Sequence, residues 1–371
     1  MAVIDILTVL DLGLALIHFI IPLAYYYHMK KKWLPKPWNA KRDWGYSPRI
    51  GIVLPTYMAS KNIASRLDNI YEQNYPKDLI EIIIVDDNSP DGTANRVKQW
   101  CEKHKGINLK LVIRPSRGGK LGAIIDGLKH VSRSTELIVF TDDDCLWDGN
   151  ALKNAVSYFT DPRVGAVTGS MRYLANGNVV HNVYRAFYNM VRIAESKLWS
   201  TPIHNGPLLM IRKSIVDKIG LPSFPGADDS AFGSYIAFAG YRAIQVDDVW
   251  VYEFISSKQH GRMFRRAYHL IIFFLKLKKY AKQKGVYRKS VFDKIWAIES
   301  YLHLVNPWIL SATVLLLLTS LTMGSLVAEM LLLIGVTLLA LKSYRTWIIM
   351  QIYLIIATIR KLLTKEIVWE R

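Results

Sequence analysis

Short apolar segments of strand length alternate with helix-length segments from residue 49 onward, and this alternation constrains the fold most strongly. We predict four buried strands, at residues 50–54, 80–85, 109–113 and 137–140. Helices at 60–73, 91–104 and 120–130 connect them. Such an alternation is typical of an α/β domain with a central, mostly parallel sheet. In that architecture ligands bind where the carboxyl ends of the strands meet.

Further segments continue this domain toward the carboxyl terminus. The sequence predicts strands at 163–168 and 205–212 and helices at 181–199 and 231–239. The loop before the last helix carries Asp228 and Asp229. Because acids at a helix start are favoured by the helix dipole, a capping role is the structural interpretation of this pair.

Apolar residues concentrate at the two ends of the chain. Residues 3–27 are mostly apolar, end in three tyrosines and precede Lys30-Lys31-Lys32. An aromatic belt before a basic cluster marks the cytoplasmic end of a membrane helix, so residues 1–32 are predicted as an uncleaved anchor with its amino terminus outside. Asp5 and Asp11 leave a buried helix of a soluble domain as the alternative.

Three parts are expected beyond the anchor. We predict a cytoplasmic domain at 33–255, amphipathic helices at the membrane surface at 256–300, and a membrane region at 301–371. Basic and apolar side chains mix over 262–280, which suits the interface rather than a span.

The carboxyl-terminal region contains three apolar runs. Residues 305–323 carry no charge and can pair with 326–341 as a membrane hairpin, whereas 346–359 is either a tilted span or an interfacial helix. The basic residues that follow should stay in the cytoplasm. We therefore expect three spans and one interfacial helix in a multi-pass cell-membrane protein.

The formal net charge of +18 permits nucleic acid, anionic lipid or a phosphorylated substrate as a partner. Much of the charge lies beside apolar segments, as in Arg262, Arg265 and Arg266. This placement favours the bilayer, and we expect no nucleic-acid partner. The two cysteines, Cys101 and Cys145, lack neighbours at zinc-ligand spacing, so neither a zinc site nor a disulfide framework is predicted.

Three acids, Asp142-Asp143-Asp144, follow the fourth predicted strand directly. Adjacent carboxylates repel one another, which favours a divalent cation among them. Asp142 and Asp144 point to the same side of an extended segment, so they form an Asp-x-Asp clamp for a metal that carries a diphosphate. A solvated acidic turn is the alternative interpretation of these residues alone.

Polar residues also follow the earlier strands. Pro55-Thr56-Tyr57 ends the first, where a nucleobase can stack on Tyr57, although a simple turn fits equally well. Asp86-Asp87 ends the second, where carboxylates can receive base and ribose donors. Two glycines precede Lys120 at a helix start, where backbone N–H groups can hold a phosphate.

Six short motifs in this order resemble the family 2 glycosyltransferases with a GT-A fold. The resemblance is to the membrane-embedded branch that includes cellulose and hyaluronan synthases and smaller glycolipid-forming enzymes, and it covers about residues 49–265. The motifs are Pro55-Thr56-Tyr57, Asp86-Asp87, Lys120-Leu-Gly122-Ala123, Asp142-Asp-Asp144, Asp228-Asp229 and Gln259-His-Gly-Arg262-Met263.

The resemblance implies a role for each donor-side motif. The loop at Pro55 with Tyr57 and Asp87 would contact the nucleotide base, and Lys120 would contact the donor. Asp144 would bind the divalent cation, Mn²⁺ or Mg²⁺, while Asp142 would contact the nucleotide sugar or the metal.

The resemblance also implies the catalytic groups. Asp229 matches the last acid of the Thr-Glu-Asp motif, the general base, although the first two positions differ here. Gln259 and Arg262 match the Gln-x-x-Arg-Trp motif, in which Met263 replaces the tryptophan that stacks on the acceptor sugar. This replacement weakens the case for a processive polymerase.

We therefore expect an inverting, metal-dependent glycosyltransferase that moves a sugar from a nucleotide-sugar donor, UDP-linked by the resemblance, to a hydroxyl of a membrane lipid or lipid-linked glycan. Two alternatives remain: a polyprenyl-phosphate glycosyl synthase and a processive polysaccharide synthase. Asp229 argues against the first, since a phosphate acceptor needs no deprotonation.

Overall fold

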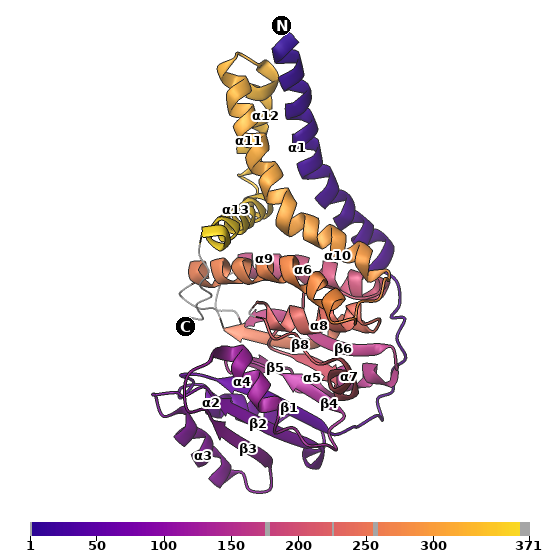
Figure 1. Cartoon of the computed structure of the whole chain (residues 1–371), viewed down its shortest axis with the longest axis vertical. Coiled ribbons are helices and arrows are strands. Elements are labelled where there is room, and N and C mark those ends of the chain that lie inside the picture. The colour runs from indigo at the N-terminus through magenta and orange to yellow at the C-terminus, as the bar shows by residue number, and fades with distance from the viewer. Residues whose placement is uncertain (1, 175–178, 225, 255–258, 364–371) are drawn as a thin grey trace.

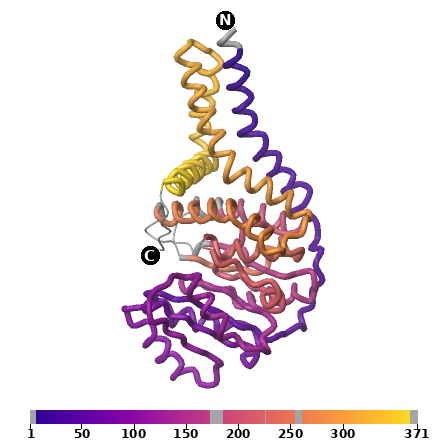
Figure 2. The backbone as a smooth tube through the Cα atoms, viewed as in Figure 1, coloured from indigo at the N-terminus to yellow at the C-terminus, as the bar shows by residue number. Residues whose placement is uncertain are grey.

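The computed structural model describes residues 2–174, 179–224, 226–254 and 259–363. Figures 1 and 2 show an α/β domain at one end and a bundle of long helices at the other, with further helices lying crosswise between them. The amino terminus lies at the far end of the bundle.

One eight-stranded sheet forms the centre of the domain, in the order β3-β2-β1-β4-β7-β6-β8-β5. Its first half is parallel and confirms the four predicted strands, which are β1 (Ile50–Thr56), β2 (Ile80–Asp86), β3 (Asn108–Ile113) and β4 (Leu137–Phe140). β1 continues through Pro55, which we expected to end it. The pairing of β4 with β1 stops at Val53, so the missing N–H of Pro55 breaks no bond on that side.

The second half of the sheet is mixed and differs more from the expectation. It contains β5 (Cys145–Trp147), β6 (Val164–Leu174), β7 (Leu209–Arg212) and β8 (Arg242–Phe254). β7 is antiparallel to both β4 and β6, whereas β6 and β8 are parallel. Neither β5 nor β8 was predicted from the sequence, since β5 is very short and charged residues obscure the alternation of β8. Residues 205–208 form a loop rather than the start of β7.

Apolar side chains cover both faces of the sheet. Ile50, Ile52 and Leu54 pack on one face, where the helices are α2 (Ile63–Tyr71), α3 (Thr93–Lys103) and α5 (Ala151–Ser157). Val53 and Phe140 point to the other face, because side chains alternate along a strand. That face is covered by α4 (Gly119–Leu128), α6 (Val179–Leu198), α7 (Lys213–Ile219), α8 (Asp228–Phe238) and α9 (Gln259–Gln283).

The bundle consists of long apolar helices. α1 (Ala2–His28) runs beside α11 (Asn306–Thr322) and α12 (Leu326–Leu338), while α13 (Lys342–Leu363) lies crosswise and packs on α9 (Figure 1). Within the described residues, three helical stretches are long and apolar enough to cross a membrane, namely Ile6–Trp33, Phe292–Thr322 and Lys342–Leu363. α12 is apolar but shorter, with 13 residues.

The second of these stretches joins the two parts of the molecule. α10 (Phe292–Ser300) passes through one π-helical turn, Tyr301–Val305, directly into α11. The predicted boundary between the interfacial helices and the membrane region, at residue 300, thus falls inside a continuous helical stretch.

Candidate active site

The turn after β4 presents Asp142 and Asp144 as predicted. Both side chains are half-buried, whereas Thr141 before them and Asp143 between them are buried. Arg66 of α2, only 1% exposed, holds this turn from below. Its Nε donates to Asp142 O at 3.1 Å and its Nη2 to Thr141 Oγ1 at 2.7 Å. These bonds fix the direction in which the two acids point.

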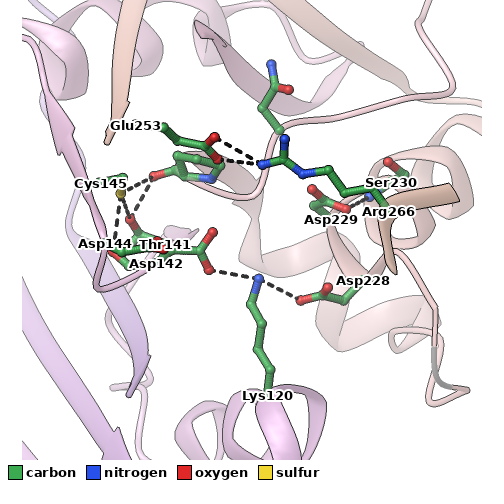
Figure 3. Close-up of polar contacts among 12 residues, drawn as sticks. Lys120, Thr141, Asp142, Asp144, Cys145, Asp228, Asp229, Ser230, Glu253 and Arg266 are labelled. Carbon is green, nitrogen blue, oxygen red and sulfur yellow. Dashed lines mark hydrogen bonds and ion pairs between the residues drawn. The ribbon is translucent and has the colours of Figure 1, made fainter. Parts of the chain in front are cut away.

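Lys120, in the first turn of α4, connects this turn with α8 (Figure 3). Its Nζ lies 2.8 Å from Asp142 Oδ1 and 3.3 Å from Asp228 Oδ2. Burial alone would raise the pKa of Asp142, but the charge and hydrogen bond of Lys120, together with the charges of Arg66 and Arg266, outweigh burial and lower the pKa. Burial would likewise lower the pKa of Lys120, yet the surrounding carboxylates hold it well above its usual value. Both groups are therefore charged at neutral pH.

Asp229 has a different environment, although it lies in the same site. It stands in the first turn of α8, and its Oδ1 accepts from the N–H of Ser230 at 2.7 Å. Burial and then the neighbouring Asp228 carboxylate raise its pKa to about 6, against the opposing effect of Lys120. The N-cap position belongs to Ala227, so Asp229 does not cap this helix.

The first turns of α9 contribute two arginines to the site. Arg262 Nη2 lies 2.7 Å from Asp144 Oδ2, and Arg266 Nη2 donates to both carboxylate oxygens of Glu253 at 3.0 Å. Gln259 is the first residue of α9, and its side chain lies outside the described part of the structure.

The predicted nucleotide loops lie at the ends of β1 and β2. Asp87 is 1% exposed and accepts from the N–H groups of Gly118 and Gly119 at 2.9 and 2.8 Å, and from Arg114. The guanidinium of Arg117 lies 4.1 Å from the centre of the Tyr57 ring.

Backbone strain marks the same loops. Among the described residues, two non-glycine residues have positive φ angles, Met58 at 53° and Asn88 at 62°. They follow β1 and β2, and such strain is common at ligand sites. Base contacts by Pro55, Tyr57 and Asp87 stay predictions.

Comparison with known proteins decides the family. The chain matches the family described as Glycosyl transferase family 2 over residues 51–220 and Glycosyl transferase family group 2 over residues 137–358, the latter being more than half of its length. This chain is a family 2 glycosyltransferase. The resemblance to the family 2 glycosyltransferases and the predicted GT-A fold are thus confirmed, whereas membership of the membrane-embedded branch stays a prediction.

One solved structure resembles this glycosyltransferase over nearly its whole length. The mannosyltransferase PcManGT from Pyrobaculum calidifontis, in complex with GDP-Man and Mn²⁺, is 40% identical, with a TM-score of 0.87. The match covers 97% of this chain and 100% of that one.

Two curated relatives match a shorter part. Glycosyltransferase AglE of Haloferax volcanii is 27% identical over 174 residues, which is 47% of this chain and 55% of AglE. The poly-beta-1,6-N-acetyl-D-glucosamine synthase of Staphylococcus epidermidis is 24% identical over 209 residues, or 55% and 49% of the two chains. The glycosyltransferase described here therefore spans about half the length of these curated relatives.

The structure brings together most of the predicted site residues of this glycosyltransferase. Lys120, Asp142, Asp144, Asp229 and Arg262 surround one region, as expected.

Some residues that position the site through hydrogen bonds had not been predicted from the sequence. Arg66 has a visible signal, because it lies among Ile63, Leu67 and Ile70 on the apolar face of α2, where an unpaired charge would be costly. Arg114 and Glu253 have no comparable signal, since their partners are distant in sequence.

Proposed function

We propose that this glycosyltransferase moves mannose from GDP-mannose to a hydroxyl group of a membrane lipid or lipid-linked glycan, with inversion at the anomeric carbon. The observation that carries the proposal is Asp229, a half-buried carboxylate of raised pKa that faces the Lys120–Asp142 pair. A base poised near neutral pH can accept the proton of an acceptor hydroxyl.

The donor assignment rests on similarity along the whole chain. The 40% identical mannosyltransferase holds GDP-mannose, so this donor takes precedence over the UDP-sugar expected from the motifs. Tyr57 and Asp87 remain the residues proposed to contact the base.

The acids at the end of β4 suit a divalent cation that arrives with the donor. Mn²⁺ and Mg²⁺ commonly bind one or two carboxylates together with substrate phosphates. Asp142 and Asp144 provide two such ligands, and no cluster of three or more metal-binding side chains occurs among the described residues. When bound, the cation would neutralise negative charge on the departing diphosphate. The Mn²⁺ in the related mannosyltransferase supports this assignment.

Protein side chains act on both the leaving diphosphate and the acceptor hydroxyl. Arg262 and Lys120 lie where they can stabilise the diphosphate as it leaves. Asp229 would take the proton from the acceptor hydroxyl. A single base and direct displacement produce inversion.

The position of the bundle supports a membrane acceptor. α9 separates the acids of the site from α13, and residues 292–322 lead directly from the domain into the bundle. We propose that α1, α11 and α12 span the membrane, that α9 and α13 lie at its surface, and that the catalytic domain is cytoplasmic.

The function is tested by a donor screen with purified chain in detergent, a polar-lipid extract of the source cells, and Mn²⁺ or Mg²⁺. Mass analysis of the lipid fraction should show a hexose added from GDP-mannose and only with cation. Transfer from UDP-sugars alone would reject the donor, and an acid-labile sugar on a lipid phosphate would reject the hydroxyl acceptor. A long polymer would indicate a processive synthase.

A further inference from the structure

One of the three consecutive tyrosines near the end of α1 is bonded to the catalytic domain. Tyr25 is 7% exposed and packs against Val191 and Ala194 of α6. Its hydroxyl donates to Oε1 of Glu195, a carboxyl group of α6 that is 1% exposed. Tyr27, by contrast, is 55% exposed. Tyr25 therefore takes part in a buried polar contact between the bundle and the domain, which a residue that only marks the membrane surface would not need.

Glu195 also contacts the loop between α6 and β7. Its other oxygen, Oε2, accepts from the buried Thr201 Oγ1 at 2.7 Å. Arg192, one turn earlier on the same face of α6, donates through Nη1 to Asn205 Oδ1 at 2.9 Å. Glu299 of α10 interacts with the Glu195 side chain as well. The loop is thus held at two points by α6, and one of these points is joined to α1 through a single carboxyl group.

The same loop contacts both acidic segments of the active site. His204 N donates to Ser230 Oγ at 3.1 Å, and Ser230 N donates to Asp229 Oδ1 at 2.7 Å. Pro207 O accepts from Thr141 Oγ1 at 2.7 Å, in the turn after β4. We call residues 201–208 the active-site loop.

The active-site loop packs tightly against the acids. A Cβ atom added at Gly206 would lie only 3.1 Å from Asp142 Oδ2 and 3.2 Å from Asp229 Oδ2, so the backbone leaves no room for one. Close-packed interiors transmit a displacement rather than absorb it. A shift of this loop would therefore move Asp142 and Asp229 relative to each other.

We propose that Tyr25 is a positioning residue for sugar transfer, which acts through Glu195 on the active-site loop. The helix α1 then helps to position the catalytic acids, beyond any role as an anchor. Because Tyr25 and Thr201 bind different oxygens of one carboxyl group, loss of the Tyr25 hydroxyl leaves a buried oxygen without this donor and loosens the bond to the loop. A displacement of about 1 Å can slow a reaction about a hundredfold.

The matched test compares Tyr25→Phe with Tyr27→Phe, since both variants lose one hydroxyl group from the same end of α1. The inference rests on the proposed function for its assay, which is transfer from GDP-mannose to the polar-lipid extract with Mn²⁺. Calorimetry with GDP and Mn²⁺ counts the molecules that bind nucleotide, so that kcat refers to these molecules alone.

We expect Tyr25→Phe to lower kcat at least about tenfold and to change KM for GDP-mannose less than about twofold. Tyr27→Phe should resemble the wild type. A purely structural role would lower the number of binding molecules or the unfolding temperature and leave kcat unchanged, and that result would overturn the inference. A loss confined to KM would overturn it as well.

A double-mutant cycle tests the route through the loop. Thr201→Val removes the bond between Glu195 and the active-site loop. If Tyr25 acts by this route, adding Tyr25→Phe to Thr201→Val should lower kcat less than about twofold further. Effects that multiply would show that the two residues act independently, contrary to the inference.

A third measurement needs no sugar transfer. Backbone amides of the active-site loop should exchange hydrogen about tenfold faster in Tyr25→Phe than in the wild type or Tyr27→Phe, because a buried hydrogen bond is lost. Unchanged exchange would contradict the link between Tyr25 and the loop. If the wild-type chain transfers no sugar at all, the proposed function fails, and the exchange rates still decide this link. If it transfers sugar and Tyr25→Phe does so equally, only this inference fails.

Discussion

In the half of the sheet formed by β1 to β4, every strand is parallel and the functional acids follow strand ends directly, as Asp87 and Asp142 do. In the other half, strand directions are mixed, and Asp229 and Arg262 come from two helix starts. The first half positions its groups by chain topology, because parallel strands end at one edge. The second half relies on buried polar contacts, as between Asn205 and Gln245. After their proposed roles we call these the donor half and the acceptor half, although Arg262 of the second half reaches across to Asp144 of the first. The donor half is positioned by the fold itself, whereas the acceptor half depends on particular residues.

The largest expected effect belongs to the donor half. Asp144→Asn removes one of two proposed cation ligands, so transfer should fall by about a thousandfold or more, since metal coordination supplies several kcal/mol of charge stabilisation. Donor binding should lose its dependence on Mn²⁺. Asp148→Asn is the control, because Asp148 follows the same turn in the sequence and its side chain accepts a local hydrogen bond from Asn150 N. Full activity of Asp144→Asn without divalent cation would contradict the metal assignment.

The acceptor half should show a smaller loss with donor binding retained. Asp229→Asn keeps an oxygen to accept from Ser230 N but removes the base, so transfer should slow at least about a hundredfold. Calorimetry should find GDP-mannose binding unchanged. Near-normal turnover would show that Asp229 is structural or that the acceptor is already ionised, which favours a phosphate.

The two halves should also respond differently to pH. Asp229 accepts a proton only when ionised, and its pKa is raised to about 6, so the transfer rate should fall as pH drops through that value, by about tenfold per unit. A divalent cation beside Asp142 adds positive charge, so Mn²⁺ should move the midpoint lower. Asp142, whose pKa is lowered, stays ionised over this range, so GDP binding should change little. A rate that is flat between pH 5 and 7 would contradict the role of Asp229.

The last prediction concerns membrane topology, and the variant that tests it should keep its transfer activity. Lys278 pairs with Asp293 at 2.7 Å, so a cysteine at the exposed Lys276 is the better reporter on α9. In a Cys101→Ser background, an impermeant thiol reagent should label Lys276→Cys only from the cytoplasmic side of sealed vesicles. Labelling from outside would place the acceptor half on the other side of the membrane.

The sequence predicted the donor half well and the acceptor half only in part. Strands such as Leu137–Phe140 are continuous apolar runs, which indicate their boundaries and the acids that follow. β8 was missed because Asp247 and Asp248 interrupt its pattern where register shifts occur in its pairing with β6.

The bonds made by Asp87 bear on how donor preference could change in related enzymes. Its carboxylate accepts hydrogen bonds from Arg114 and from the N–H groups of Gly118 and Gly119. A substitution of Asp87 would remove these hydrogen bonds and destabilise the loop, whatever its effect on the choice of nucleotide base. We therefore expect this position to tolerate little variation. Tyr57 and Arg117 instead stack on each other at the neighbouring loop, with the guanidinium 4.1 Å from the ring centre. Exchanging GDP-sugars for UDP-sugars by directed evolution should therefore begin with that stacked pair and leave Asp87 untouched.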